Sequence, residues 1–232
     1  MKKISARTRR KLKDYIRKGV RKIKHRKGYG VHSPFAYAVI TEVIEERNAY
    51  YAYQRMRRLY PKGGVLPFKV ACLLFRLANR FRVRTVLEIG CDGGYSLLPL
   101  LLVDSHNQVT SVATACQRGE TERHLTAFRG SLNRVGFAES LPGLPDDYVA
   151  DMVVVNGLPD GMDPQVFLGW IQQHTHEQSL FFVRGIQPGH QLEQFWDGVC
   201  ECDRIEVTMD LYDYGLAIRR PHFFKQHYVV SF

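Results

Sequence analysis

In the last two thirds of the chain, short apolar runs alternate with longer polar stretches. Buried strands of a parallel sheet have this appearance, and most of the polar stretches are compatible with helices that cover the sheet. The last two runs are separated only by residues 211–214, too few for a parallel crossover, so they should form an antiparallel hairpin. The pattern predicts an α/β fold with a doubly wound, mostly parallel sheet. The expected strands are one directly before Gly90 and then 108–114, 132–137, 151–156, 179–184, 204–210 and 215–219.

Ahead of the first strand the apolar residues have helical spacing. Phe35, Val39 and Val43 recur at four-residue steps, and Ser33-Pro34 is typical of a helix start, with serine as the N-cap and proline in the first turn. A loop is expected at residues 61–64 and a second helix at about 67–80. We expect these helices to cover the sheet on its ligand side.

Composition agrees with a globular α/β protein. The 232 residues are 45% hydrophobic, which suits one α/β domain with an appendage. No window approaches the ~20 apolar residues that span a bilayer, and no apolar segment follows the N-terminal charges, so we expect a cytoplasmic location. The five cysteines are odd in number and form no CxxC pair, which favours free thiols over a disulfide framework or a zinc ribbon.

The net charge of +10 is concentrated at the N-terminus. Residues 1–28 hold fourteen Lys and Arg against the single acid Asp14, which leaves the rest of the chain at about −3. The segment also has apolar residues at roughly helical spacing, so it could form a basic amphipathic helix that attracts RNA, DNA or anionic lipid. The alternative is a solvated helix that packs one stripe on the body of the protein.

The segment TVLEIGCDGGYS, residues 85–96, predicts a strand, a tight turn and the start of a helix. Glu88 precedes Gly90 and Gly94; the glycines let the backbone turn sharply and approach a ligand, and the next helix presents free N–H groups to it. The spacing differs from the dinucleotide G-x-G-x-x-G pattern. The pattern indicates a small-molecule site, although such glycines also occur only to permit close packing.

This segment resembles motif I of class I S-adenosylmethionine (SAM) dependent methyltransferases. Five segments of the chain together resemble a group of bacterial class I methyltransferase-like proteins, which is related to small-molecule O-methyltransferases. These segments are GVHSPFAYAVITEVI, LLFRLANRFRVRTVLEIG, DMVVVNG, VTMDLYDYGLAIRR and QHYVVSF. The resemblance covers nearly all of the chain after the basic tail at residues 1–28, and it implies a helical cover over 29–80 and a Rossmann-like domain with a seven-stranded type of sheet over 81–232. It also implies SAM at the carboxyl ends of the strands and methyl transfer to an oxygen or nitrogen nucleophile.

Carried over residue by residue, the resemblance gives a cofactor site with departures. Thr114 stands where the family places an acid that accepts both ribose hydroxyls, and loss of that acid would weaken binding about ten- to a hundredfold. Phe137 stands where a Gly-Asp pair commonly lies near the adenine. The motif I positions that match, with their neighbours in the loop, are Glu88, Gly90, Asp92, Gly93, Gly94 and Tyr95.

The related O-methyltransferases hold a divalent metal with Asp residues after the fourth and fifth strands. The matching places here are Asn156-Gly157 and Val183-Arg184-Gly185. Because an arginine would repel a cation, we expect no catalytic metal, and no catalytic base or other catalytic residue is identified. Arg184 could instead bind an anionic ligand.

Other polar residues each have a functional and a structural interpretation. His174, His176 and Glu177 could be metal ligands, but their place in a hydrophilic link between a helix and a strand favours solvent exposure. His32 and Ser33 could reach the mouth of the site, although helix capping explains Ser33 equally well.

Two pairs further along the chain are ambiguous in the same way. Asp160 and Asp163 could replace a missing acid, with turn formation as the default for DGMDP. Tyr212 and Tyr214 are expected to pack in the hairpin.

Three functions remain open. The first is a divergent, metal-independent SAM methyltransferase that acts on an unidentified small-molecule or macromolecular acceptor. The second is a methyltransferase-like fold without turnover that binds a ligand or acts as a scaffold. The departures from the family pattern at Thr114, Phe137 and Arg184 favour this second function. The third is a nucleic-acid or membrane-surface protein in which residues 1–28 do the binding. The oligomeric state is left open.

Overall fold

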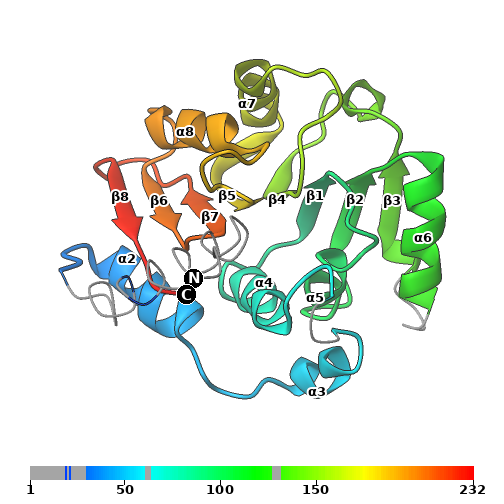
Figure 1. The fold of residues 1–232 in the computed structure, drawn as a ribbon, viewed down its shortest axis with the longest axis horizontal. Coiled ribbons are helices and arrows are strands. Elements are labelled where there is room, and N and C mark those ends of the chain that lie inside the picture. Colours follow the sequence, from blue (N-terminus) through cyan, green and yellow to red (C-terminus); the bar gives the residue numbers. More distant parts are fainter. Residues whose placement is uncertain (1–18, 20, 22–29, 61–63, 127–131) are drawn as a thin grey trace, which may run out of the picture.

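A mixed eight-stranded sheet forms the centre of the molecule (Figure 1). The computed structural model describes residues 19, 21, 30–60, 64–126 and 132–232. The strand order is β3-β2-β1-β4-β5-β7-β6-β8, and β7 runs antiparallel to both of its neighbours, β5 and β6. The doubly wound, mostly parallel sheet and its C-terminal hairpin are thereby confirmed. The strands are β1 Thr85–Ile89, β2 Gln108–Val112, β3 Val135–Ala138, β4 Ala150–Val155, β5 Thr175–Arg184, β6 Val207–Asp210, β7 Tyr214–Ile218 and β8 Gln226–Val229.

The sheet has one strand more than the seven that we expected. β8 pairs in parallel with β6, with Val207 opposite Gln226, and so forms the edge of the sheet beyond the hairpin. Its residues are exposed or half-buried, and Gln226 and His227 break the apolar run that marks the other strands. An edge strand that buries little has a weak hydrophobic signal, which is why the pattern of the sequence did not predict it.

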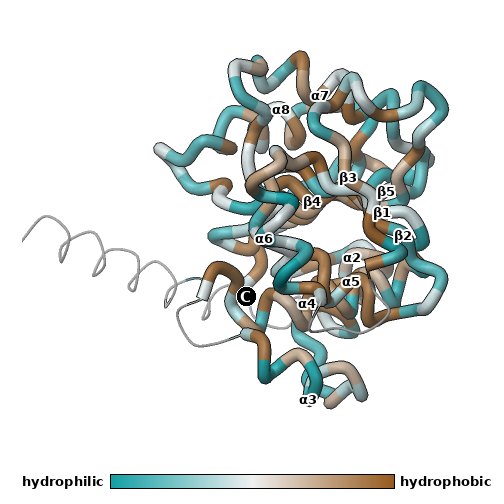
Figure 2. The backbone as a smooth tube through the Cα atoms, turned by 90° about the vertical axis from the view of Figure 1, so that its right-hand side faces the viewer, coloured by the Kyte–Doolittle hydropathy of each residue, from teal (hydrophilic) through white to brown (hydrophobic). Residues whose placement is uncertain are grey.

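Helices cover both faces of the sheet. α7 and α8 pack on one face, and α2, α4 and α5 pack on the other (Figure 1). Hydrophobic residues are concentrated in the strands and in α4 and α5, whereas α6 is largely hydrophilic (Figure 2). The helices are α2 Pro34–Val39, the π-helix η1 Ile40–Ile44, α3 Tyr51–Arg57, α4 Phe68–Arg80, α5 Leu97–Leu101, α6 Ala115–Thr126, α7 Pro164–Gln173 and α8 Glu193–Glu201, with short 3-10 turns at Leu132–Arg134 and Leu141–Gly143.

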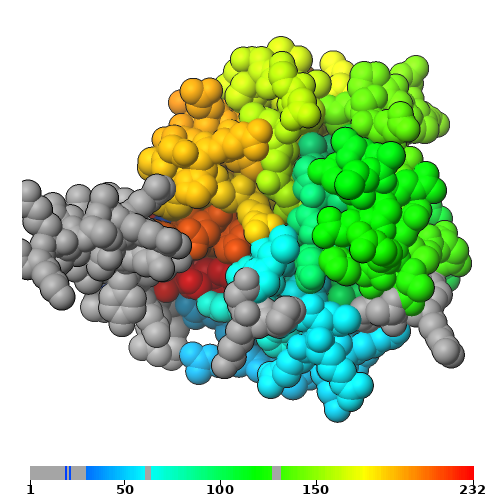
Figure 3. All heavy atoms as spheres, turned by 45° about the vertical axis from the view of Figure 1, so that its right-hand side comes forward, coloured from blue at the N-terminus to red at the C-terminus, as the bar shows by residue number. Residues whose placement is uncertain are grey.

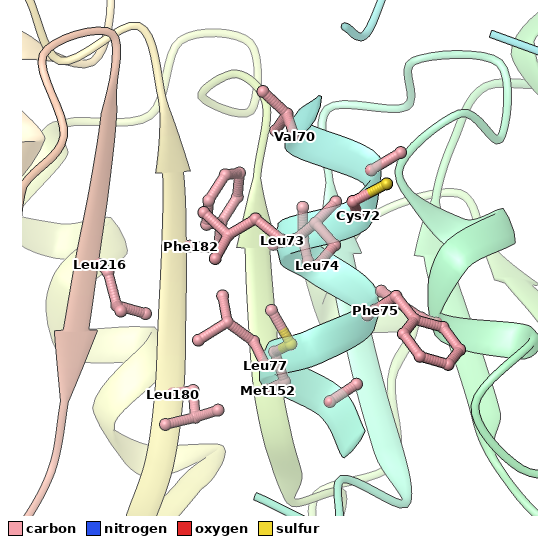
Figure 4. Close-up of a cluster of buried hydrophobic side chains, with 14 of the residues drawn as sticks. Val70, Cys72, Leu73, Leu74, Phe75, Leu77, Met152, Leu180, Phe182 and Leu216 are labelled. Atoms are coloured by element: carbon pink, nitrogen blue, oxygen red, sulfur yellow. The ribbon is translucent and has the colours of Figure 1, made fainter. Parts of the chain in front are cut away.

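The helix expected at residues 67–80 is confirmed as α4, which begins after Pro67. Leu73 and Leu77 point from α4 toward Met152 and Phe182 on the sheet (Figure 4). Full burial of such side chains stabilises the fold by about 1.5–3 kcal/mol each. α4 therefore covers a face of the sheet. The expectation that these helices lie over the ligand end of the strands was wrong for α4. The apolar stripe of α4 is buried only if it packs against an apolar surface, and the face of the sheet provides that surface.

The N-terminal cover is tied together by a buried arginine. The Arg76 side chain is 6% exposed, and its Nε donates to the Val43 carbonyl (2.5 Å) while Nη2 donates to the Ile44 carbonyl (3.2 Å). These carbonyls lie at the end of η1, where a helix leaves acceptors without intrahelical partners. Nη1 donates to the Tyr53 hydroxyl (2.9 Å), so one side chain joins η1, α3 and α4.

The basic segment lies almost entirely outside the described residues, as does most of the loop expected at 61–64. Within residues 1–28 the structure describes Gly19 and Arg21, and Arg21 Nη2 lies 2.9 Å from Asp210 Oδ2 at the end of β6. Binding of nucleic acid or an anionic surface through this segment stays a prediction. Among the described residues, no helix combines the length and the apolar character that crossing a membrane requires.

Candidate functional site

The glycine-rich loop after β1 lies at the point where the strand order reverses. β1 leads toward β2 and β3 on one side, and its other neighbour, β4, leads toward β5. In open α/β sheets, ligands bind outside the carboxyl ends of the strands at this switch point. Gly90 has φ +76°, and a Cβ atom on it would lie 2.5 Å from the amide nitrogen of Gly157, which follows β4. Only glycine permits this contact between the two loops.

Glu88 is fully buried directly before that loop. Ser111 on β2 donates to Oε2 (2.5 Å), Asn156 after β4 donates to Oε1 (3.2 Å), and Ser96 at the start of α5 also donates to Oε1. Burial raises the pKa of Glu88 to about 8 and the Asp92 carboxylate adds to the shift, while the hydrogen bonds from Ser111 and Ser96 oppose it. The carboxyl group thus joins β1, β2, β4 and α5 beneath the loop.

The raised pKa of Glu88 predicts that stability falls as the pH rises. Between its ordinary value of 4.5 and about 8, the folded protein holds a proton that the unfolded chain has released, so the free energy of unfolding decreases across this window. Glu88→Gln keeps the shape of the protonated side chain and carries no titrating proton. We expect urea unfolding at about pH 5, 6, 7 and 8 to give a shallower decline for Glu88→Gln than for the wild type. Equal slopes in the two proteins would contradict the assignment, since Glu88 is the one titrating side chain that differs between them.

Asp92 presents a buried oxygen without a hydrogen bond. Its Oδ1 accepts from the Ser96 amide (3.0 Å), whereas Oδ2 has no hydrogen-bond partner among the described residues. Arg184 Nη1 lies 3.7 Å from Oδ2, beyond hydrogen-bond distance. Burial raises the pKa of Asp92, although the Ser96 amide and Arg184 favour its charged form. An unpartnered buried acceptor beside the loop fits a ligand that donates hydrogen bonds or carries positive charge.

Arg184 is the last residue of β5 and reaches the site from the carboxyl end of the sheet. Its Nη2 donates to the Val65 carbonyl, in the chain that leads into α4, and the Tyr60 hydroxyl donates to the Tyr95 carbonyl (2.5 Å). The chain between α3 and α4, rather than the helices themselves, therefore meets the ligand end of the strands.

The other side of the loop packs against α6. His124 Nδ1 lies 2.8 Å from the Gly93 carbonyl, and its ring lies 5.0 Å from that of Tyr95. A Cβ atom on Gly94 would lie 3.1 Å from Thr121 Cγ2. α6 forms much of one surface of the molecule (Figure 3, green). Close packing, the alternative explanation for these glycines, thus accounts for part of the motif.

Thr114 and Gln117 form a capping box at the start of α6. The Thr114 hydroxyl donates to Gln117 Oε1 (3.1 Å), which also accepts from the Thr114 amide (2.9 Å). Thr114 was expected at the site from the sequence and Gln117 was not, although Thr-x-x-Gln is a capping signal that could have indicated it. Phe137 lies on β3 opposite Ser111, and the Arg118 guanidinium stands 5.1 Å from its ring centroid. The two positions therefore lie at the carboxyl ends of β2 and β3, on one side of β1.

The histidine candidates lie elsewhere. Ser33 caps α2 by accepting from the Ala36 amide (3.3 Å), which confirms its capping role, and its neighbour His32 is exposed. His174 stacks on Trp170 with ring centroids 3.8 Å apart. His176 lies in β5, which already begins at Thr175, and not in a link between elements. Its side chain is 41% exposed, and its Nε2 lies 2.9 Å from Asp151 Oδ1.

The remaining candidates have structural roles. Asp163 caps α7 by accepting from the Gln165 amide (2.8 Å), and Asp160 is exposed in the preceding turn. Tyr214 stacks on Phe182 with centroids 5.5 Å apart, and Tyr212 is buried with φ +78°. Within the part of the chain that the structure describes, no three His, Cys, Asp or Glu side chains are grouped to hold a metal ion.

No family model and no curated protein matches the chain. Solved structures do. The O-methyltransferase from Bacillus cereus in complex with SAH is 15% identical, with a TM-score of 0.57 over 79% of this chain and 97% of that one. TomG from Streptomyces achromogenes, an O-methyltransferase in tomaymycin synthesis solved with SAM, is 17% identical, with a TM-score of 0.55 over 79% and 96%. The SAH-bound Podospora anserina methyltransferase PaMTH1 is 14% identical, with a TM-score of 0.55 over 82% and 96%. This likeness shows that the chain has the fold of class I methyltransferases.

Proposed function

We propose that this protein is a SAM-dependent methyltransferase that acts on a small-molecule acceptor without a catalytic metal. The observation that carries the proposal is the Gly90–Gly94 loop at the β1/β4 switch point, with the buried, unpartnered Oδ2 of Asp92 beside it. Proteins of the same fold have been solved with SAM or SAH.

Each part of the site would hold a different part of the cofactor. Asp92 Oδ2 would accept a hydrogen bond from the cationic methionine end, while Glu88 below keeps the loop in place. Thr114 and Gln117 would face the ribose with one hydroxyl and one amide in place of a carboxylate, and Phe137 would lie beside the adenine. Bound there, SAM supplies an activated methyl group that an oxygen or nitrogen nucleophile can accept.

Arg184 supports chemistry without a metal. It lies where the related O-methyltransferases are expected to place an acid, and its guanidinium is 3.7 Å from Asp92, so a divalent cation at this point would meet a fixed positive charge. Among the described residues, those at the site could position the acceptor, and none of them is an evident general base. Holding an acceptor in line with the methyl group supplies much of a rate enhancement by itself.

Calorimetry with purified protein tests the proposal. We expect SAM and SAH each to bind one site with micromolar affinity, and added magnesium to leave both values unchanged. An acceptor screen with radiolabelled methyl groups would follow. Absence of binding up to millimolar SAM would overturn the proposal, and binding that requires magnesium would overturn its metal-independent part.

A second candidate is a binding module of the same fold without turnover. The packing of α6 on Gly93 and Gly94 and the engagement of Thr114 in a helix cap favour it, because both use groups that a cofactor would otherwise contact. SAM binding without methyl transfer to any class of acceptor would favour the module over the enzyme.

A further inference from the structure

A cavity of about 210 Å³ lies at the opposite end of the sheet from Gly90. Three arginines line it: Arg82 in the turn between α4 and β1, and Arg219 and Arg220 directly after β7. Because β7 is antiparallel to β5, its carboxyl end meets the amino ends of β1, β4 and β5. The length of a five-residue strand, about 15 Å, separates this cavity from the glycine-rich loop, so the two are distinct places.

Two of these guanidinium groups are fixed by the fold. Arg219 Nη1 donates to the carbonyl and the hydroxyl of Thr175, each at 3.2 Å. The Arg220 guanidinium stands 4.8 Å from the ring centroid of Phe35. The Nε groups of Arg219 and Arg220 are both buried and have no hydrogen-bond partner among the described residues. These two atoms are closed off from solvent, so a ligand in the cavity would bind the terminal nitrogens of the arginines and not Nε.

Arg82 adds a third cation at a position that favours glycine. It has φ +52° directly after α4, and the Val83 amide donates to the Ala78 carbonyl (3.0 Å), as in a Schellman motif. Glycine is the usual residue at this place because an L side chain is strained there. The Arg82 side chain makes no hydrogen bond or ion pair with the described residues and lines the cavity.

The acidic group at the cavity is already engaged. The Asp151 carboxylate accepts from the amides of Arg84 (2.6 Å) and Thr85 (2.9 Å), and His176 Nε2 lies 2.9 Å from it. His176 Nδ1 accepts from the Gln178 amide (3.0 Å), so both ring nitrogens of His176 have a partner. Glu206 Oε2 accepts from the Arg220 amide (2.6 Å), so a second carboxylate lies nearby and is also engaged. Three guanidinium groups against these two bonded carboxylates leave a net positive charge at the cavity.

We propose that this cavity binds the phosphate group of a small molecule. Phosphate accepts several hydrogen bonds and pairs with guanidinium groups, three of which line this cavity. The volume is more than ten times the ~10–15 Å³ that one water needs, so a polyatomic anion has room, whereas water alone would leave the charge of three arginines uncompensated. The carboxyl ends of the strands, where the proposed cofactor site lies, take no part.

Calorimetric titration with inorganic phosphate against sodium chloride of equal ionic strength tests this site. We expect saturable, one-site binding to the full-length wild type in the millimolar range or tighter, and Arg82→Gln to weaken it at least about tenfold. Arg84→Gln is the matched control, because it removes the same charge two residues away from a side chain paired with Asp104 (3.0 Å). Its phosphate affinity should stay within about twofold. The basic segment 1–28 is the same in all three proteins and cannot produce the difference.

A second variant separates binding from folding. Arg82→Gly removes the charge and suits the left-handed backbone, so it should lose phosphate affinity like Arg82→Gln while its melting temperature is equal or higher. Glycerol phosphate and phosphoserine, titrated alongside, identify the source: tighter binding than inorganic phosphate indicates a phosphomonoester, and equal binding indicates the free ion. No saturable binding in tens of millimolar phosphate, or equal weakening by Arg84→Gln, would overturn the proposal. SAM affinity should be the same in all variants, so this result is independent of the proposed function.

Discussion

Replacement of Gly90 by alanine is expected to lower the free energy of unfolding by about 2–5 kcal/mol and to abolish SAM binding. Gly90 has φ +76°, where an L residue costs about 1–2 kcal/mol. The added Cβ would also lie 2.5 Å from the Gly157 amide nitrogen and 2.9 Å from the Gly157 Cα. Both atoms belong to the backbone and cannot rotate away, so one of the two loops must move.

The displacement acts on the site because the two loops hold it together. Asn156, next to Gly157, donates to Glu88, and the loop that starts at Gly90 carries Asp92. A shift of the loop would move Asp92 Oδ2 from the place where we propose that it meets the cofactor. We therefore expect at least a hundredfold loss of SAM affinity, measured by calorimetry at a temperature where the variant remains folded.

Gly119→Ala is the control for the same chemical change. Gly119 lies within α6, has no atom within 4 Å of an added Cβ, and should gain up to about 1 kcal/mol from the better helix propensity of alanine. Urea unfolding followed by tryptophan fluorescence should move the two midpoints in opposite directions. A Gly90→Ala protein with the wild-type midpoint and SAM affinity would show that the contact with Gly157 does not constrain the loop.

What could be predicted from the sequence is what the backbone demands locally. The strand, turn and helix start at residues 85–96 are confirmed, because an apolar run followed by glycines that adopt positive φ has few other solutions. The cap at Ser33 and the antiparallel pair of β6 and β7 are confirmed for the same reason: serine before proline and a connection that is too short to cross over are local signals.

Contacts between residues that lie far apart in the chain had no such local signal in the sequence. Arg184 was considered as a ligand for an anion, and nothing in its own segment shows that its guanidinium lies 3.7 Å from Asp92, ninety-two positions earlier. The packing of α6 on the glycine loop depends on His124 and Thr121, which are ordinary residues of a polar helix. β8 was missed because an edge strand with polar residues buries too little to show an apolar period.

Glu88→Ala is expected to cost at least about 3 kcal/mol of stability and to remove SAM binding. The carboxyl group is fully buried and is bonded by Ser96, Ser111 and Asn156, which come from three different elements. Alanine leaves a cavity, and buried polar groups that lose their partner cost about 1–3 kcal/mol each. Ser96 and Asn156 are themselves hydrogen-bonded (3.2 Å), so they retain one contact and part of the loss is offset.

Glu88→Gln separates the loss of a charge from the loss of the hydrogen-bonded network. Because the pKa of Glu88 is about 8, the wild-type side chain is mainly protonated near neutral pH, and glutamine should restore most of the stability that alanine loses. Glu139→Ala, an exposed carboxylate after β3, should change the stability by no more than about 0.5 kcal/mol. If SAM affinity returns with Glu88→Gln, then Glu88 holds the loop through its shape and hydrogen bonds. If stability returns and SAM affinity does not, then the negative charge itself acts on the cofactor. Unchanged stability and affinity in Glu88→Ala would remove the basis for placing the cofactor at this loop.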